Sequence, residues 1–186
     1  PKPQNPKIMA NNYLKNMNGF PQKPIFLVGD WQGIGEVIGR DVQYKEMSQF
    51  HVVKEEPAIV VNWQQFTKHN TTEKPLHAEN GFLKILPMKA VGATGNQFKA
   101  ELMLSHPFSV NEMYRQCVYD FDNNTLVAEA YDENCFQRGP TAKGKKITGV
   151  KRVYKLGDNG TMEYDMHLAI EGGSLEHHLW ACLKHI

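Results

Sequence analysis

The sequence predicts an all-β protein: an antiparallel up-and-down β-barrel of about ten strands with a short N-terminal helix. Apolar and polar residues alternate with a period of two through most of the chain after Ile25, which is typical of strands that bury one face. Turn-forming residues separate these stretches, and no long helical pattern intervenes, which excludes parallel βαβ units. Closing such a meander removes exposed strand edges and can enclose a small ligand.

The chain divides into an extension, residues 1–24, and a barrel domain, residues 25–186. In the extension we expect a helix at Ala10–Met17 that stops at Asn18-Gly19, and Pro21 and Pro24 prevent further helix before the core begins. In the barrel domain we expect strands at Trp31–Val37, Val42–Val53, Ala58–Phe66, Gly81–Leu86, Phe98–Leu104, Tyr114–Phe121, Thr125–Tyr131, Ile147–Leu156, Met162–Leu168 and Glu176–Lys184.

Two strands and two turns carry the clearest patterns. Phe98–Leu104 places its apolar residues on one face, and Met162–Leu168 does the same with Met162, Tyr164, Met166 and Leu168. The segments Asp122–Asn124 and Gly157–Gly160 have the composition of tight antiparallel connections. Both patterns indicate strands that pair with their neighbours in sequence order.

The stretch Asp132–Lys146 is the least regular part of the chain. It contains Gly139-Pro140 and a basic cluster, Lys143, Lys145 and Lys146. A solvated loop is the simpler interpretation. The alternative is a flap over the barrel mouth or a rim that attracts anions.

Composition and charge exclude several classes of protein. The chain has 186 residues, is 41% hydrophobic and has a net charge of +1, which argues against a nucleic-acid partner. No apolar run approaches the length of a membrane span. The chain begins without a signal-like segment, which fits a mature secreted chain or a trimmed domain as well, so the compartment stays unknown, with cytoplasmic slightly favoured over secreted. The three glycosylation sequons, at Asn70, Asn123 and Asn159, are close to what chance provides.

The reactive residue types form no familiar hydrolytic motif. The three cysteines, Cys117, Cys135 and Cys182, allow either one disulfide with a free thiol or three free thiols, and without a CxxC pair we expect no structural zinc site. The eight histidines contain no HExxH pattern, and no GxSxG elbow is present. The spacing of Gly33, Gly35 and Gly39 superficially resembles a dinucleotide-binding fingerprint, but no helix is expected after them. We expect these glycines to relieve crowding where a strand bends.

Arg152-Val153-Tyr154 offers a candidate ligand site. Residues two apart on a strand point to the same face, so Arg152 and Tyr154 would clamp a ligand carboxylate if they face the barrel interior. If they face outward, they are an ordinary exterior pair. The Arg-x-Tyr pattern also resembles the carboxylate-binding residues of fatty-acid-binding proteins.

Four segments, in order, resemble one family, the nitrobindins. Nitrobindins are haem-binding β-barrels, calycin-like and related in shape to fatty-acid-binding proteins. The resemblance covers the chain from about Phe26 to Lys184. The matching segments are Gly29–Gly35 for the family's GxWxGxG opening, Val42–Glu46 for its next strand, Pro75–Leu83 for its PxHxExGFxR segment, and His178-Leu179 with Lys184 for its last strand.

The resemblance implies a function and a set of site residues. It implies haem b with His178 as the iron ligand, with Leu76 and His77 beside the haem and Leu168 at a methionine-type pocket position. It also implies reversible binding of nitric oxide and isomerisation of peroxynitrite to nitrate at ferric haem. A neutral imidazole is a common axial ligand for haem iron, which makes this role chemically reasonable.

Three features depart from the family's pattern. Glu36–Asp41 is shorter than the family's segment and lacks its YPT-type sequence, Glu133–Lys146 resembles an insertion, and Trp180 is bulkier than expected. By strand parity His178 shares a face with Trp180 and Cys182, while Leu179 and Ala181 share the other, so parity leaves the direction of His178 open. The competing function is a carrier of a fatty acid or of another apolar ligand or chromophore.

Overall fold

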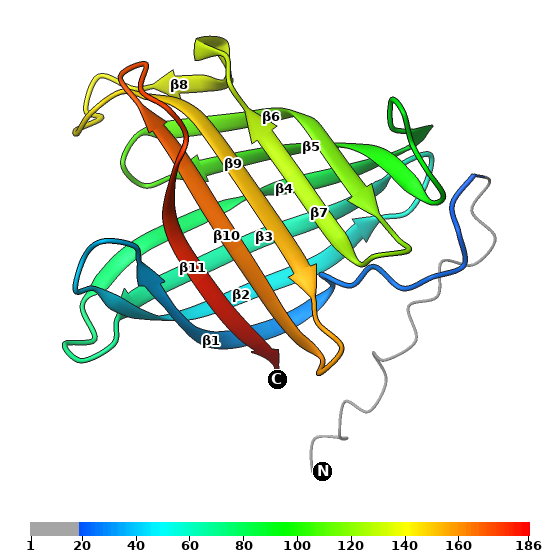
Figure 1. Cartoon of the computed structure of the whole chain (residues 1–186), viewed down its shortest axis with the longest axis horizontal. Helices are drawn as coiled ribbons and strands as arrows, with labels where there is room; N and C mark the ends of the chain where they lie inside the picture. The colour runs from blue at the N-terminus through cyan, green and yellow to red at the C-terminus, as the bar shows by residue number, and fades with distance from the viewer. Residues whose placement is uncertain (1–18) are drawn as a thin grey trace, which may run out of the picture.

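The computed structural model describes residues 19–186, and within this range the chain is an antiparallel β-barrel without an α-helix (Figure 1). The helix expected at Ala10–Met17 lies outside the described residues. The strands are β1 (Gly29–Val37), β2 (Gln43–Lys54), β3 (Ile59–His69), β4 (Pro75–Lys89), β5 (Gln97–His106), β6 (Val110–Asp120), β7 (Thr125–Ala130), β8 (Phe136–Arg138), β9 (Ile147–Leu156), β10 (Thr161–Ile170) and β11 (Glu176–His185).

The sheet closes as the sequence predicts. Strands that follow one another in the chain pair with one another, β5 pairs with β6, and β1 pairs with β11. The short strand β8 stands outside this cycle and adds to the beginning of β6, so that β7 pairs directly with β9. The result is a closed barrel of ten strands with β8 as an appendage.

Two regions differ from the expected elements. β4 begins at Pro75 rather than Gly81. The residues before Gly81 include polar ones that face the barrel interior, so the apolar alternation that indicates a strand is absent there. The irregular stretch Asp132–Lys146 contains a 3-10 turn, η1 (Glu133–Cys135), and the strand β8, and both Cys135 and Phe136 are buried. This stretch is therefore partly packed against the barrel rather than wholly solvated.

Aromatic side chains fill one end of the barrel. The segment before β1 crosses this end, where the backbone N–H of Phe26 donates to the Tyr119 hydroxyl at 2.9 Å and the two rings stack. Phe98 and Phe121 pack edge to face beside them. Such close-packed rings leave no room for a ligand here, so the hollow part of the barrel lies at the other end.

Glycines in β1 permit a close approach of its neighbours. A Cβ on Gly33 would lie 2.0 Å from the carbonyl oxygen of Cys182 in β11, and one on Gly35 would lie 2.3 Å from the Tyr44 ring in β2. Neither space admits a side chain. This supports the prediction that these glycines relieve crowding within a strand and do not bind a dinucleotide.

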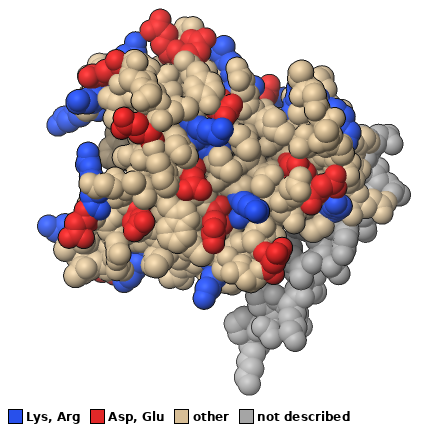
Figure 2. Space-filling view, viewed as in Figure 1, with Lys and Arg blue, Asp and Glu red and all other residues tan. Residues whose placement is uncertain are grey.

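The outer surface carries mixed charge. Figure 2 shows basic and acidic side chains interspersed over one face, in keeping with the small net charge. All three cysteines are free thiols, which selects the second of the two alternatives allowed by the sequence. Among the described residues there is no helix long and apolar enough to cross a membrane.

Candidate functional site

A cavity of about 340 Å³ opens at the end of the barrel where β1 ends and β11 begins. This is the end marked by β8 and the β10–β11 hairpin in Figure 1. The volume lies in the range of small-molecule sites. The apolar part of its wall comprises Val37, Leu76, Phe108, Val110, Ile147, Met166, Leu168 and Leu179.

His178 reaches this cavity because of a β-bulge. Along β10 the partner in β11 changes from Leu179, opposite Met166, to His177, opposite His167, which leaves His178 as the extra residue. A bulge turns an extra residue out of strict alternation, and both His178 and Leu179 line the cavity as a result. Trp180 does not line the cavity, because alternation resumes beyond the bulge and buries Ala181 and Leu183 instead.

The His178 imidazole is suited to bind a metal. The ring is half-buried, and burial lowers its pKa, with the positive charge of Arg40 adding to the effect. The side chain is therefore neutral at pH 7. Neither of its ring nitrogens forms a hydrogen bond with the described residues, so a lone pair remains available toward the cavity.

The structure brings the other residues named by the resemblance to the same cavity. Leu76 and His77 extend from the start of β4, and Leu168 from the end of β10. Cations stand at the mouth: Lys143 and Lys145 line it from the β8–β9 loop. This placement agrees with the alternative of a basic rim over the barrel mouth.

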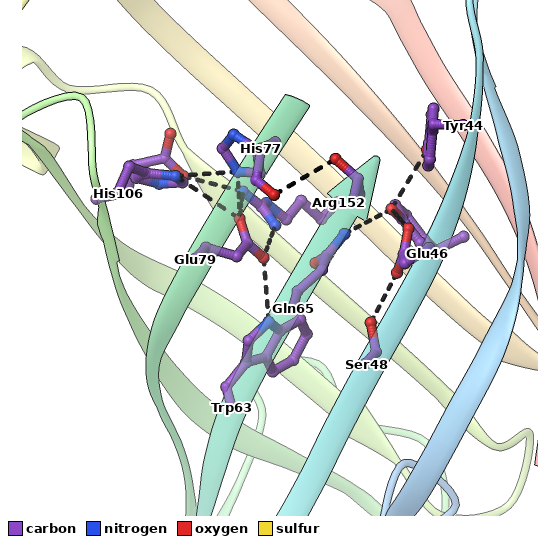
Figure 3. Close-up of polar contacts among 12 residues, drawn as sticks. Tyr44, Glu46, Ser48, Trp63, Gln65, His77, Glu79, His106 and Arg152 are labelled. Atoms are coloured by element: carbon purple, nitrogen blue, oxygen red, sulfur yellow. Dashed lines mark hydrogen bonds and ion pairs between the residues drawn. The ribbon is translucent and has the colours of Figure 1, made fainter. Parts of the chain in front are cut away.

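The floor of the cavity is a buried ion cluster. Arg152 donates to both oxygens of Glu79, at 2.7 and 2.9 Å, to Glu112 at 3.2 Å and to the Tyr114 hydroxyl at 2.7 Å. Burial alone would raise the pKa of Glu79, but the charge of Arg152 and the contact with His77 outweigh it and hold that pKa well below its usual range. Glu79 is therefore ionised at neutral pH, and Figure 3 shows these groups converging.

Arg152 and Tyr154 both face the interior, so the exterior alternative is wrong. The Arg152 guanidinium is already paired with two carboxylates of the protein. A ligand carboxylate would have to displace Glu79 or Glu112 to reach it. The geometry therefore gives little support to a fatty-acid clamp at this position.

A third buried carboxylate, Glu46 of β2, forms no hydrogen bond with Arg152. It accepts hydrogen bonds from the Tyr164 hydroxyl at 2.5 Å and from Ser48 at 2.7 Å. Burial raises the pKa of Glu46 to about 7 despite these bonds. Glu46 therefore holds a proton at a higher pH than an ordinary glutamate does.

Sequence reasoning missed most of this polar floor. Glu46, Glu79, His106 and Glu112 are interior residues that it did not select as site residues. One signal was present: Glu46 and Glu112 sit at positions that share a face with buried aromatic residues, Tyr44 and Tyr114. A carboxylate on such a face needs a buried partner, and Arg152 is the interior cation that supplies it for Glu112.

Comparison with known proteins identifies a family. Residues 23–185 match the family described as "THAP4-like, heme-binding beta-barrel domain". Proteins named peroxynitrite isomerase are similar along most of the chain: one from Parafrankia sp. is 28% identical over 178 residues, covering 85% of this chain and 76% of that protein. One from Mycobacterium tuberculosis is 27% identical over 161 residues, covering 84% and 89%. The crystal structure of Rv2717c from M. tuberculosis aligns with a TM-score of 0.65 at 25% identity, covering 87% of this chain and 93% of that one.

Proposed function

Because the chain belongs to the family of THAP4-like heme-binding β-barrel domains, we propose that its cavity binds haem b with His178 as the axial ligand. We further propose that the loaded protein binds nitric oxide and isomerises peroxynitrite to nitrate, the activity for which its relatives are named. The observation that carries the proposal is the bulge that brings His178 to the cavity, where Leu76, Leu168 and Leu179 form part of the wall.

The residues present fit a haem. A flat, largely apolar group suits the walls formed by Leu76, Leu168 and Leu179, and a neutral imidazole on a strand offers a ligand fixed by the sheet. Lys143 and Lys145 at the mouth suit anionic groups, such as the propionates of haem. The fit thus rests on three kinds of side chain in three places: apolar walls, one available imidazole and a basic rim.

When bound, haem would supply an iron centre able to take up a small molecule such as nitric oxide or peroxynitrite. The chain's residues then have separate tasks. His178 holds the iron, and the apolar walls exclude water. The two lysines attract an anion such as peroxynitrite to the mouth.

Haem titration of the purified protein tests the binding proposal. We expect a Soret band that saturates at one haem per chain, loss of that band's intensity in His178→Ala, and recovery when imidazole is added to the variant. The matched control is His51→Ala, because His51 is an exposed histidine on the outer side of β2. An unchanged spectrum in His178→Ala contradicts the ligand assignment.

The catalytic part of the proposal has its own measurement. Haem-loaded protein should accelerate peroxynitrite decay and direct it to nitrate, whereas protein without haem should do neither. A native sample that carries a fatty acid or another chromophore and takes up no haem would favour the carrier function instead.

A further inference from the structure

Two histidines and a glutamate meet on the inner wall of the cavity. His77 and Glu79 are two residues apart on β4 and so point to the same side, and His106 is the last residue of the neighbouring strand β5. The register pairs Asn80 with Ser105, which places Glu79 and His106 next to each other. Figure 3 shows the three side chains directed toward one another.

The spacing of the three candidate ligand atoms matches the coordination sphere of a metal ion. His77 Nε2 lies 3.2 Å from His106 Nδ1 and 3.4 Å from Glu79 Oε2, and the last two atoms are 3.8 Å apart. Zinc binds imidazole nitrogen and carboxylate oxygen at about 2.1 Å, and two tetrahedral ligands at that distance are separated by roughly 3.4 Å. All three separations lie within a few tenths of an ångström of this value, so one ion can reach all three atoms with small adjustments.

The carboxylate contacts of His106 are long: its Nε2 lies 3.4 Å from Glu112 Oε2, and its Nδ1 lies 3.8 Å from Glu79 Oε2. Its side chain is only 5% exposed, and its Nε2 atom is buried without a hydrogen bond. Its Nδ1 faces a second imidazole nitrogen, an arrangement in which one ring must donate and the other accept. A buried imidazole normally has better partners, and an ion between the two rings would use both lone pairs.

The surroundings of the three ligands resemble the outer sphere of a metal site. Trp63 Nε1–H and Arg152 both donate to Glu79 Oε1, and a second Arg152 N–H donates to Oε2 at 2.9 Å, so the carboxylate is held with Oε2 toward the histidines. Glu112 Oε2 lies 3.4 Å from His106 Nε2, where it can receive the proton of a ring that binds metal through Nδ1. Arg152 contributes one positive charge and Glu79 and Glu112 two negative charges, so the fixed charges around the histidines sum to −1, which favours a cation.

We propose that His77 Nε2, Glu79 Oε2 and His106 Nδ1 form a binding site for one divalent transition-metal ion, with zinc as the ion that the spacing suits best. The open side of the site faces the cavity, since all three residues line it, and a water molecule or an anion can take the fourth position. The ligand set does not include His178, the proposed iron ligand, so zinc binding can be measured in the haem-free protein. The two proposed sites share the cavity, because His77 also lies beside the proposed haem. No sequence motif indicates this site, because its ligands come from two strands.

Calorimetric titration of the haem-free protein with Zn²⁺ alone tests the site. The visible absorption of bound Co²⁺ reports the coordination geometry. We expect one ion per chain, a rise in the unfolding temperature with zinc, and cobalt bands of a tetrahedral site with nitrogen and oxygen ligands. His77→Asn should weaken binding by about 100-fold or more, since even outer-sphere changes cost about 10- to 100-fold. His77 is one-third exposed, so this variant is the least disruptive of the three; unfolding without metal checks that it folds.

Two variants distinguish this site from other places where an ion could bind. His177→Asn is the matched control, because His177 is a partly exposed histidine beside Asp165 on the outside of the barrel. His178→Ala removes the proposed iron ligand. Both should bind zinc as the unchanged protein does. The proposal is overturned if the unchanged protein does not bind zinc stoichiometrically. It is also overturned if zinc binding survives His77→Asn but is lost in either of the other two variants.

Discussion

Removing the Arg152 guanidinium should destabilise the protein severely. In Arg152→Met the four hydrogen bonds of the guanidinium disappear, and the carboxylates of Glu79 and Glu112 remain buried without their cation. Breaking a buried ion pair from one side costs about 3–5 kcal/mol. For a chain of this length that corresponds to a fall of about 6–20 °C in the unfolding temperature. Urea unfolding gives the free energy directly through the midpoint and slope.

The loss should depend on pH in a defined direction. In the unchanged protein the pKa of Glu79 is depressed, so its contribution to stability is present above the carboxyl's ordinary pKa and is lost as the pH falls below it. Without Arg152, burial raises the pKa of Glu79, and an ionised carboxylate then costs most at high pH. The difference in unfolding free energy should therefore be largest near neutral pH and shrink toward about pH 4.

The neighbouring residue provides the control. Lys151 forms an ion pair with Glu129 at 2.8 Å, but on the outer side of the barrel with both side chains partly exposed. Lys151→Met should cost about 0–1 kcal/mol. If Arg152→Met costs no more than Lys151→Met, or if its cost is the same at all pH values, the reasoning about the buried cluster is wrong.

Three further changes have defined outcomes. The raised pKa of Glu46, about 7 against an ordinary 4.5, means that the protein loses stability as the pH rises between these values. Glu46→Gln should remove this loss, which is on the order of 3 kcal/mol. If the unfolding free energy changes equally with pH between pH 5 and 8 in both proteins, the assignment is wrong. Reversing the charge of the cavity rim with Lys143→Glu and Lys145→Glu should slow haem association, most strongly at low ionic strength. Lys184→Glu, at an exposed position of β11 outside the cavity, should leave the rate unchanged. Identical association rates in stopped-flow mixing would exclude electrostatic steering by the rim. Gly33→Ala places a methyl group against the Cys182 carbonyl and should cost at least about 1–3 kcal/mol in urea unfolding, and Gly173→Ala, whose nearest contact is 3.2 Å away, should cost less.

The barrel was predictable because burial is periodic along its strands. Phe98, Ala100, Leu102 and Leu104 are all buried, as their alternation indicates. The start of β4 was not predictable in the same way. Its inward positions carry His77 and Glu79, and a pattern based on apolar residues interprets such positions as the end of a strand.

The candidate site was only partly accessible from sequence. Strand parity could not orient His178, because the bulge that turns it inward depends on the pairing of β11 with β10. The ion cluster was hidden for a related reason: Arg152 is far from Glu79 in the chain, and only closure of the sheet brings them within 2.7 Å. Residue types on one strand can indicate a polar interior position, but the partner comes from the fold.

We propose that the bulge at His178 presents an imidazole to iron inside the barrel. A crystal structure of the haem-loaded protein measures this directly. We expect continuous density between the iron and a ring nitrogen of His178, with the haem edge toward Lys143 and Lys145. Iron bound by another residue, or a haem lying outside the barrel, would contradict the account.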